Sequence, residues 1–185
     1  LSAMRESSSY HISVKGGRFL EAVSQADTIV FDKTGTLTYA TPTVAQIVPF
    51  GDRDEAEMLR LAACLEEHYP HSMANAVVDE AKRRGLSHEE YHSQVQYVVA
   101  HGISSMVENK SVLIGSAHFV FEDEGCCVPE NEREKFAAIP VQYSHLYLCI
   151  NGELAAVLCI HDPLRREARA AVAALHECGF TNVVM

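Results

Sequence analysis

The sequence predicts an α/β domain that is interrupted by a larger α+β unit. The apolar run 26–31 leads into a loop rich in Gly and Thr, and the end of the chain returns to a helix followed by a strand. This alternation is typical of a parallel sheet covered by helices. Residues 42–158 instead combine short strands, hairpin turns and helices, as in an antiparallel α+β unit. We therefore expect 1–41 and 159–185 to form one truncated α/β unit around the insertion 42–158.

Length and composition restrict the class of protein. The 185 residues are 48% apolar and 22% charged, which suits one full domain or two small ones and excludes disorder, collagen and coiled coil. The formal net charge of −10 argues against a nucleic-acid-binding protein, which needs a basic face. No apolar stretch approaches the roughly 18 residues of a membrane span, and a signal-peptide pattern is absent. We expect this part of the protein to be soluble.

The six cysteines do not predict disulfides or zinc binding. Cys126 and Cys127 are adjacent, and no Cys-x-x-Cys pair occurs. The pattern favours an intracellular, reducing compartment. The other four are predicted to be buried, reduced thiols in apolar runs: Cys64, Cys149, Cys159 and Cys178.

The flanking segments give the elements of the α/β unit. Residues 1–12 are polar and Ser-rich and are predicted to be a frayed or cut end. A short helix is expected over 18–24, and a buried β-branched strand over 26–31. Near the other end, a helix is predicted over 165–177 and a strand from 182. Since the chain stops in that strand, we expect a truncated domain.

Within the insertion, two short turns predict β-hairpins. Asn151-Gly152 is a strong hairpin signal, and Glu108-Asn109-Lys110 is a second turn. Hydrophobic periodicity gives the remaining elements. Strands are predicted at 43–48, 95–99, 102–108, 111–114, 145–150 and 153–160, and helices at 54–65, 72–84, from 117, and at 130–138.

The loop after the strand 26–31 has the residues of a phosphate site. Asp32 follows the carboxyl end of a buried parallel strand, which is where α/β sheets bind ligands. Lys33 supplies a positive charge, Thr34 and Thr36 supply hydroxyls, and Gly35 allows backbone amides to approach a phosphate. A carboxylate that attacks phosphorus forms an acyl phosphate and needs Mg²⁺ to bring two anions together.

The identity of the residue two positions after Asp32 favours a lasting phosphoenzyme. An acidic group there would protonate a leaving group and activate water, and Thr34 does neither well. An acyl phosphate on Asp32 is therefore expected to persist, which suits a pump more than a phosphatase.

These residues resemble a known family. The segment matches, over all seven positions, the phosphorylation motif of the P-type ATPases: Asp32-Lys33-Thr34-Gly35-Thr36-Leu37-Thr38. The resemblance implies that Asp32 is the nucleophile, with Lys33, Thr34 and Thr36 in the catalytic loop. It also implies that Asp32 and Thr34 hold Mg²⁺ together with the phosphate. The alternative, a simple strand-end turn, does not require this order of residues.

The insertion resembles the heavy-metal-transporting branch of that family. The motif of this branch is Glu-x-x-x-x-His-Pro-x-Ala-x-Ala, and the matching residues are Glu66, His71, Ala74 and Ala76. Ser72 departs from the motif, because it stands where the branch has Pro. At the start of a helix, His71 would stack on or hydrogen-bond to adenine, and Glu66 would accept from the exocyclic amine. On its own, His71 would be a surface helix-start residue, or half of a metal pair with His68. Together with the Asp32 motif, nucleotide contact is the favoured interpretation.

Three further matches complete the resemblance. The family's Gly-x-Gly appears as Ala100-His101-Gly102, and its Gly-Asn/Ser pair as Gly115-Ser116; as isolated residues, these glycines would be turns or bulges. Asp162 and Arg165 resemble the Asp-x-x-Arg/Lys return into the phosphorylation domain, where they would contact ribose or phosphates or steady the hinge. Helix capping by Asp162, with Pro163 at the first helical position, explains this segment equally well.

The resemblance implies a fold and a function. The flanks would be a truncated α/β haloacid-dehalogenase-like phosphorylation domain, and 42–158 the nucleotide-binding domain. Bound ATP and Mg²⁺ would phosphorylate Asp32 in a membrane cation pump whose actuator and transmembrane domains are its partners. This part would face the cytoplasm. Apart from the resemblance, the truncated sheet would leave strand edges exposed, so we expect its strands to pair with each other or with another copy of the chain. The alternatives are a haloacid-dehalogenase-type phosphatase with a large cap and a free-standing ATP-binding module.

Overall fold

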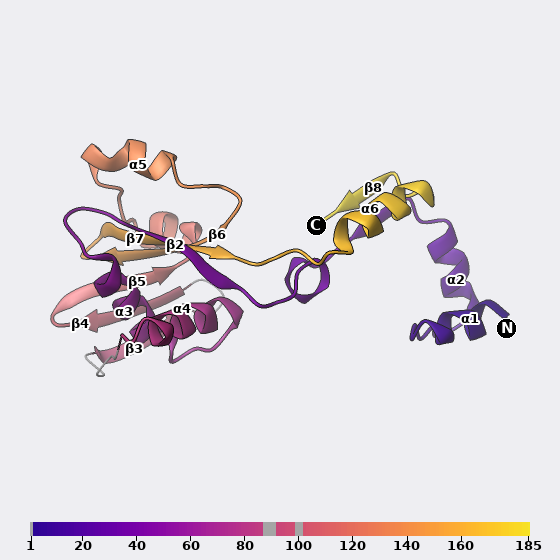
Figure 1. Cartoon of the computed structure of the whole chain (residues 1–185), viewed down its shortest axis with the longest axis horizontal. Coiled ribbons are helices and arrows are strands. Elements are labelled where there is room, and N and C mark those ends of the chain that lie inside the picture. Colours follow the sequence, from indigo (N-terminus) through magenta and orange to yellow (C-terminus); the bar gives the residue numbers. More distant parts are fainter. Residues whose placement is uncertain (1, 87–91, 99–101) are drawn as a thin grey trace. The chain divides into compact units, whose positions relative to one another are not determined.

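The computed structural model describes residues 2–86, 92–98 and 102–185. Ala100 and His101 of the predicted Gly-x-Gly position lie outside these residues. The chain divides into two compact units, one formed by the residues up to Thr38 with Leu164–Met185, the other by Tyr39–Pro163 (Figure 1). Within the described ranges, no helix is both long enough and apolar enough to cross a membrane.

The smaller unit contains a two-stranded parallel sheet. Strand β1 (Thr28–Val30) pairs with β8 (Asn182–Val184) in parallel, with Ile29 opposite Val183. The pairing continues past β1, because the Phe31 amide donates to the Val184 carbonyl at 2.8 Å. The unit also holds α1 (Ser2–Ser9), α2 (Gly17–Ser24), the π-helical segment η1 (Lys33–Leu37) and α6 (Ala168–Glu177). The predicted α/β character of the flanks is therefore present. The buried strand predicted over 26–31 is wrong in length and burial, because β1 covers only Thr28–Val30 and both of these residues are exposed.

The predicted frayed end over residues 1–12 is wrong, because Ser2–Ser9 form the helix α1. Its centre contains Ala, Met, Arg and Glu, which are good helix formers. Its serines also bond back into the helix: the Ser7 hydroxyl donates to the Ala3 carbonyl at 2.9 Å.

The helix predicted over 165–177 begins three residues later in the structure, because the residues before it bond to the Asp32 loop. Leu164 bridges to Thr38, and the Arg165 amide donates to the Leu37 carbonyl at 2.8 Å. The helix α6 therefore begins at Ala168 with Glu167 as its N-cap residue. Asp162 does not cap it, which rules out the helix-capping explanation of that residue. Cys178, which follows α6, is exposed and not buried as predicted.

The larger unit is built on a six-stranded antiparallel sheet in the order β2-β7-β6-β5-β4-β3 (Figure 1). Both predicted hairpins are confirmed: Glu108-Asn109 and Asn151-Gly152 have positive φ angles, as two-residue hairpin turns require. Lys110, predicted in the turn, belongs to β5. The strands are β2 (Thr43–Pro49), β3 (His92–Val98), β4 (Gly102–Val107), β5 (Lys110–Gly115), β6 (Ser144–Ile150) and β7 (Glu153–His161).

The sheet buries a hydrophobic cluster on each face, because successive strand residues point to opposite sides. On one face, Ile47 and Leu158 pack with α3 (Glu55–Glu66) and α4 (Ser72–Arg83). On the other face, Val48 and Val157 pack with the π-helical η2 (His118–Asp123) and with Phe136 of α5 (Arg133–Ala137). A short 3₁₀ turn, η3 (Glu130–Glu132), precedes α5. The strand β7 continues to His161, so the boundary predicted after residue 158 falls inside a strand.

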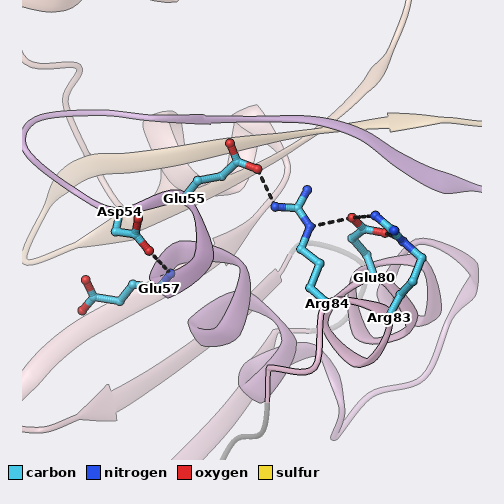
Figure 2. Close-up of polar contacts among 6 residues, drawn as sticks. All are labelled: Asp54, Glu55, Glu57, Glu80, Arg83 and Arg84. Atoms are coloured by element: carbon cyan, nitrogen blue, oxygen red, sulfur yellow. Dashed lines mark hydrogen bonds and ion pairs between the residues drawn. The ribbon is translucent and has the colours of Figure 1, made fainter.

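Charged side chains connect the far ends of α3 and α4 (Figure 2). Arg84 donates to Glu55 at 2.6 Å and to Glu80 at 2.7 Å, and Arg83 also donates to Glu80. These arginines, Arg83 first, lower the pKa of Glu80 from 4.5 to about 2. Asp54 caps α3 by accepting from the Glu57 amide at 3.0 Å. The two helices are thus held at the ends opposite to Glu66 and His71.

Candidate functional site

The Asp32 loop leaves the parallel sheet at the carboxyl end of β1. Asp32 is exposed and has an extended backbone, with φ −70° and ψ 142°. The next residues turn sharply, because Thr34 is non-helical and Gly35 has φ 82°, a conformation that glycine adopts without strain. Thr34 and Thr36 are exposed and Lys33 is half-buried. The loop therefore presents a carboxylate and two hydroxyls to solvent.

Thr38 closes this loop from inside. It is 1% exposed, its hydroxyl donates to the Lys33 carbonyl at 3.2 Å, and the same oxygen accepts from the Gly35 amide at 3.2 Å. The Thr38 amide also donates to the Lys33 carbonyl, at 3.1 Å. The last residue of the seven-residue motif thus fixes the shape of the loop.

Arg165 holds the same loop from the other end of the chain. Its Nε donates to the Thr38 carbonyl at 3.1 Å, and its Nη2 donates to the Gly35 carbonyl at 3.2 Å. Arg165 was predicted to contact ribose or phosphates or to steady the hinge, and in the structure it lies against the Asp32 loop. Asp162 has a buried Oδ1 atom without a hydrogen-bond partner among the described residues. A ligand or solvent group would satisfy that atom.

The residues at this loop fit part of a Mg²⁺ site. Mg²⁺ prefers oxygen ligands, and the Asp32 carboxylate and the Thr34 carbonyl are of that kind. In the part of the chain that the structure describes, no three His, Cys, Asp or Glu side chains gather closely enough to hold a metal ion. The loop therefore offers a partial ligand set that a phosphate and further groups would complete.

A second site lies at one end of the six-stranded sheet, where β4 begins, β5 ends and β6 begins. A pocket of about 450 Å³ opens there. It brings together predicted residues from three separate stretches of sequence, which are Glu66, His71, Gly102, Gly115 and Ser116. The sequence motifs did not identify its other lining residues, which are Met73, Ile103, Ser144, His145 and Leu146.

Glu66 is a buried carboxylate in the wall of this pocket. It is the last residue of α3 and is 2% exposed. Its Oε2 lies 3.2 Å from His71 Nε2, but it makes no well-aligned hydrogen bond within the described residues. A buried carboxylate oxygen in this state is available to accept from a donor on a ligand.

His71 is held by the start of the helix that follows it. It is the N-cap residue of α4, and its Nδ1 accepts from the Ala74 amide at 3.2 Å. The neutral ring therefore carries its hydrogen on Nε2, facing Glu66. The contact with Glu66 raises the pKa of His71 above 6.5, while partial burial opposes the rise. Ser72 is the first residue of α4, a position where the family's Pro would fit equally well.

The two pocket glycines lie opposite each other on the neighbouring strands β4 and β5, where Gly102 pairs with Gly115. A Cβ atom on Gly102 would lie 2.3 Å from the Phe119 ring and 2.5 Å from the Ile114 carbonyl oxygen. Packing against the protein interior thus requires glycine there. The Ser116 hydroxyl accepts from the Phe119 amide at 3.3 Å, which leaves its hydrogen free to bond a ligand.

Comparisons with known proteins agree with this architecture. A model of the haloacid dehalogenase-like hydrolase family matches residues 26–185. A copper-exporting P-type ATPase of Vibrio cholerae is 35% identical over 176 residues, which are 94% of this chain and 19% of the relative. A zinc-exporting P-type ATPase of Mycobacterium marinum is 31% identical over 94% of this chain and 24% of the relative. The chain thus spans 19–24% of the length of these relatives.

Solved structures give the same result. The catalytic domain of the CPx-ATPase CopB-B has a TM-score of 0.64 at 24% identity, over 100% of this chain and 61% of that one. A zinc-transporting PIB-type ATPase has a TM-score of 0.58 at 28% identity, over 93% of this chain and 27% of that one. The predicted fold class and family resemblance are therefore confirmed. The chain belongs to the haloacid dehalogenase-like hydrolase family and is homologous to the heavy-metal-transporting P-type ATPases.

Proposed function

We propose that this chain is the cytosolic ATP-binding part of a membrane pump that transports a heavy-metal cation through an aspartyl-phosphate intermediate. The observation that carries the proposal is the convergence of Glu66, His71, Gly102 and Gly115 on one pocket. The chain also contains the complete loop that begins at Asp32. The relatives named above export copper or zinc, which supports a heavy-metal cargo without distinguishing between metals. The partners would be the transmembrane and actuator domains of the parent chain.

The pocket suits adenine because of one buried acceptor among apolar walls. Met73, Ile103 and Leu146 provide apolar surface for a flat base. An ionised Glu66 carboxylate accepts hydrogen bonds but cannot donate them, and the exocyclic amine of adenine donates one. Guanine presents a carbonyl oxygen at the corresponding position, which a carboxylate repels. The pocket therefore favours ATP and ADP over guanine nucleotides.

The Asp32 loop supports phosphoryl transfer. The Asp32 carboxylate oxygen would attack the γ-phosphorus of ATP, forming an acyl phosphate as the bond to the leaving ADP breaks. Lys33 and the Thr36 hydroxyl would contact the phosphate, while Arg165 and Thr38 keep the loop in shape. Mg²⁺ held by Asp32 and the Thr34 carbonyl would reduce repulsion between the two anions. Because Thr34 cannot act as a base, hydrolysis would need a group from elsewhere in the parent protein.

Calorimetric titration of the chain with ADP, ATP and GDP tests the proposal. We expect adenine nucleotides to bind with a Kd on the order of 0.1–1 mM, as for a site that one domain supplies only in part. Chelation of Mg²⁺ should change this Kd less than about twofold, since the described lining residues contact the base region. Failure of ADP to bind at several times this concentration would refute the proposed function.

Two variants test the recognition of the base. Glu66→Gln exchanges one acceptor oxygen for an amide donor, so ADP should bind more weakly and GDP relatively better. His71→Ala should weaken ADP binding by removing a wall of the pocket. Glu67→Gln, a change of the same type at an exposed neighbour, is the matched control. An unchanged ADP-to-GDP preference in Glu66→Gln would contradict the assignment of Glu66.

A further inference from the structure

One wall of the nucleotide pocket comes from outside the sequence motifs. His145 lies at the start of β6 and lines the same pocket as Glu66 and His71. We propose that His145 contacts the nucleotide base through the carbon atoms and faces of an immobilised imidazole ring, and so contributes to base preference. This inference rests on the proposed function, because it names a further residue of the same site.

Both nitrogens of the His145 ring are engaged within the protein. Nε2 lies 3.0 Å from the Pro140 carbonyl oxygen, and Nδ1 lies 3.3 Å from the Tyr147 hydroxyl. A carbonyl oxygen can only accept, so Nε2 carries a hydrogen and donates it. In the neutral ring, Nδ1 then accepts from the Tyr147 hydroxyl. What remains for a ligand is the carbon edge and the faces of the ring.

Tyr147, one of the two residues that hold His145, packs against the hydrophobic cluster that contains Val48 and Val157. The Tyr147 ring meets Phe121 edge-on at 5.2 Å between centroids, and lies 6.2 Å from Phe136 of α5. The His145 ring meets Tyr147 edge-on at 5.9 Å and 81°. The ring orientation is therefore fixed before a ligand binds, and binding costs little side-chain entropy.

The pocket is lined from both faces of the sheet. His71 belongs to the layer of α3 and α4, which packs with Leu146. His145 is next to Leu146 in β6, so it points to the other face, together with Tyr147. At the end of the sheet both side chains reach the same pocket. A planar base in this pocket therefore has an imidazole ring available from each layer, in addition to the apolar walls.

Substitutions separate a ring contact from a polar contact. An aromatic contact of this kind corresponds to roughly a two- to tenfold change in Kd. His145→Ala should therefore raise the Kd of ADP and the Kd of adenosine by the same factor within this range, because the lost contact is to the base. His145→Phe loses both hydrogen bonds that hold the ring but keeps a flat ring, so it should bind ADP more tightly than His145→Ala does. His161→Ala removes an exposed histidine that is not among the pocket residues, and should leave ADP binding unchanged.

Calorimetry on these variants decides the proposal. Equal ADP affinity for His145→Ala and the original chain would overturn it, and so would a His145→Phe variant as weak as His145→Ala. If Glu66→Gln alters ADP binding while His145→Ala does not, the proposed function survives and this inference fails. If the original chain binds no ADP, the proposed function itself fails, and the inference fails with it.

Nuclear Overhauser effects provide a readout that does not depend on a variant folding. With ADP bound to the unmodified chain, we expect cross-peaks between adenine H2 or H8 and the carbon-bound protons of the His145 ring. Cross-peaks from adenine to Met73 or Leu146 without any to His145 would overturn the proposal. Circular dichroism on each variant shows whether the fold is kept.

Discussion

Substitution of Gly102 by alanine should destabilise the larger unit because the new methyl group has no space. Its carbon would lie 2.3 Å and 2.6 Å from two atoms of the Phe119 ring and 2.5 Å from the Ile114 carbonyl oxygen. Carbon atoms in contact are normally about 3.5–4.0 Å apart, so a shift of about 1 Å is needed. Phe119 is 1% exposed, and the Ile114 carbonyl belongs to β5, so neither moves freely.

The expected loss follows from these contacts. Overpacking in a tight core costs about 1–3 kcal/mol, and the contact with backbone places Gly102→Ala at the upper end. Replacing glycine by alanine in a strand returns about 0.5–1 kcal/mol, because the unfolded chain loses conformational freedom. We expect a net loss of about 2 kcal/mol, a large part of the 5–15 kcal/mol that stabilises a typical domain.

Urea unfolding followed by far-ultraviolet circular dichroism measures this loss; the chain has no tryptophan to report by fluorescence. Ser104→Ala, on the same strand, is the control and should change the free energy of unfolding by less than about 0.5 kcal/mol. Combining Gly102→Ala with Phe119→Leu should cost less than the sum of the two changes, because the smaller side chain relieves the overlap. A Gly102→Ala chain as stable as the original would refute the reasoning.

Three other predictions follow from the structure. Ser72→Pro should raise the free energy of unfolding by about 0.4–1 kcal/mol without weakening ADP binding. A residue before proline must be extended, and His71 already is, with φ −142° and ψ 172°. Thermal unfolding measures the change, and a loss of stability would contradict the prediction. Glu80→Gln should cost about 1 kcal/mol at pH 7, less than the full pKa shift implies because its partner Arg83 is exposed. Since the folded-state pKa of Glu80 is lowered from 4.5 to about 2, this stabilisation is present above pH 4.5 and is lost as the pH falls through about 2. Urea unfolding at pH 7 and at about pH 2 should show that the stability difference between Glu80→Gln and the original chain disappears at the lower pH, with exposed Asp79→Asn as the control. A stability difference that does not depend on pH would count against this prediction. The chain alone should form no stable aspartyl phosphate, because the Asp32 loop offers only part of a Mg²⁺ ligand set; acid-stable label from γ-labelled ATP on Asp32 would contradict this.

The sequence by itself determined most of the elements and supplied the residues from which the two candidate sites are proposed. The apolar run before Asp32 and the hairpin signal Asn151-Gly152 are local, so neighbouring residues are enough to predict a strand and a turn. The Asp32 loop and the His71 region were likewise evident from residue types at short spacing. The predictions from local sequence were wrong at α1 and at the start of α6. At α6 the reason is a set of hydrogen bonds, because Arg165 bonds to the Asp32 loop and does not begin a helix.

Only the tertiary structure decided which distant residues share a surface. From the sequence, Gly102 on its own would be a turn or bulge glycine, but the structure shows that the Phe119 ring occupies the place of its side chain. His145 carries no motif, and it joins the pocket because β6 lies beside β5 and because Pro140 and Tyr147 orient its ring. Such contacts depend on sheet register and on packing between layers, which link residues far apart in the chain and leave no local pattern.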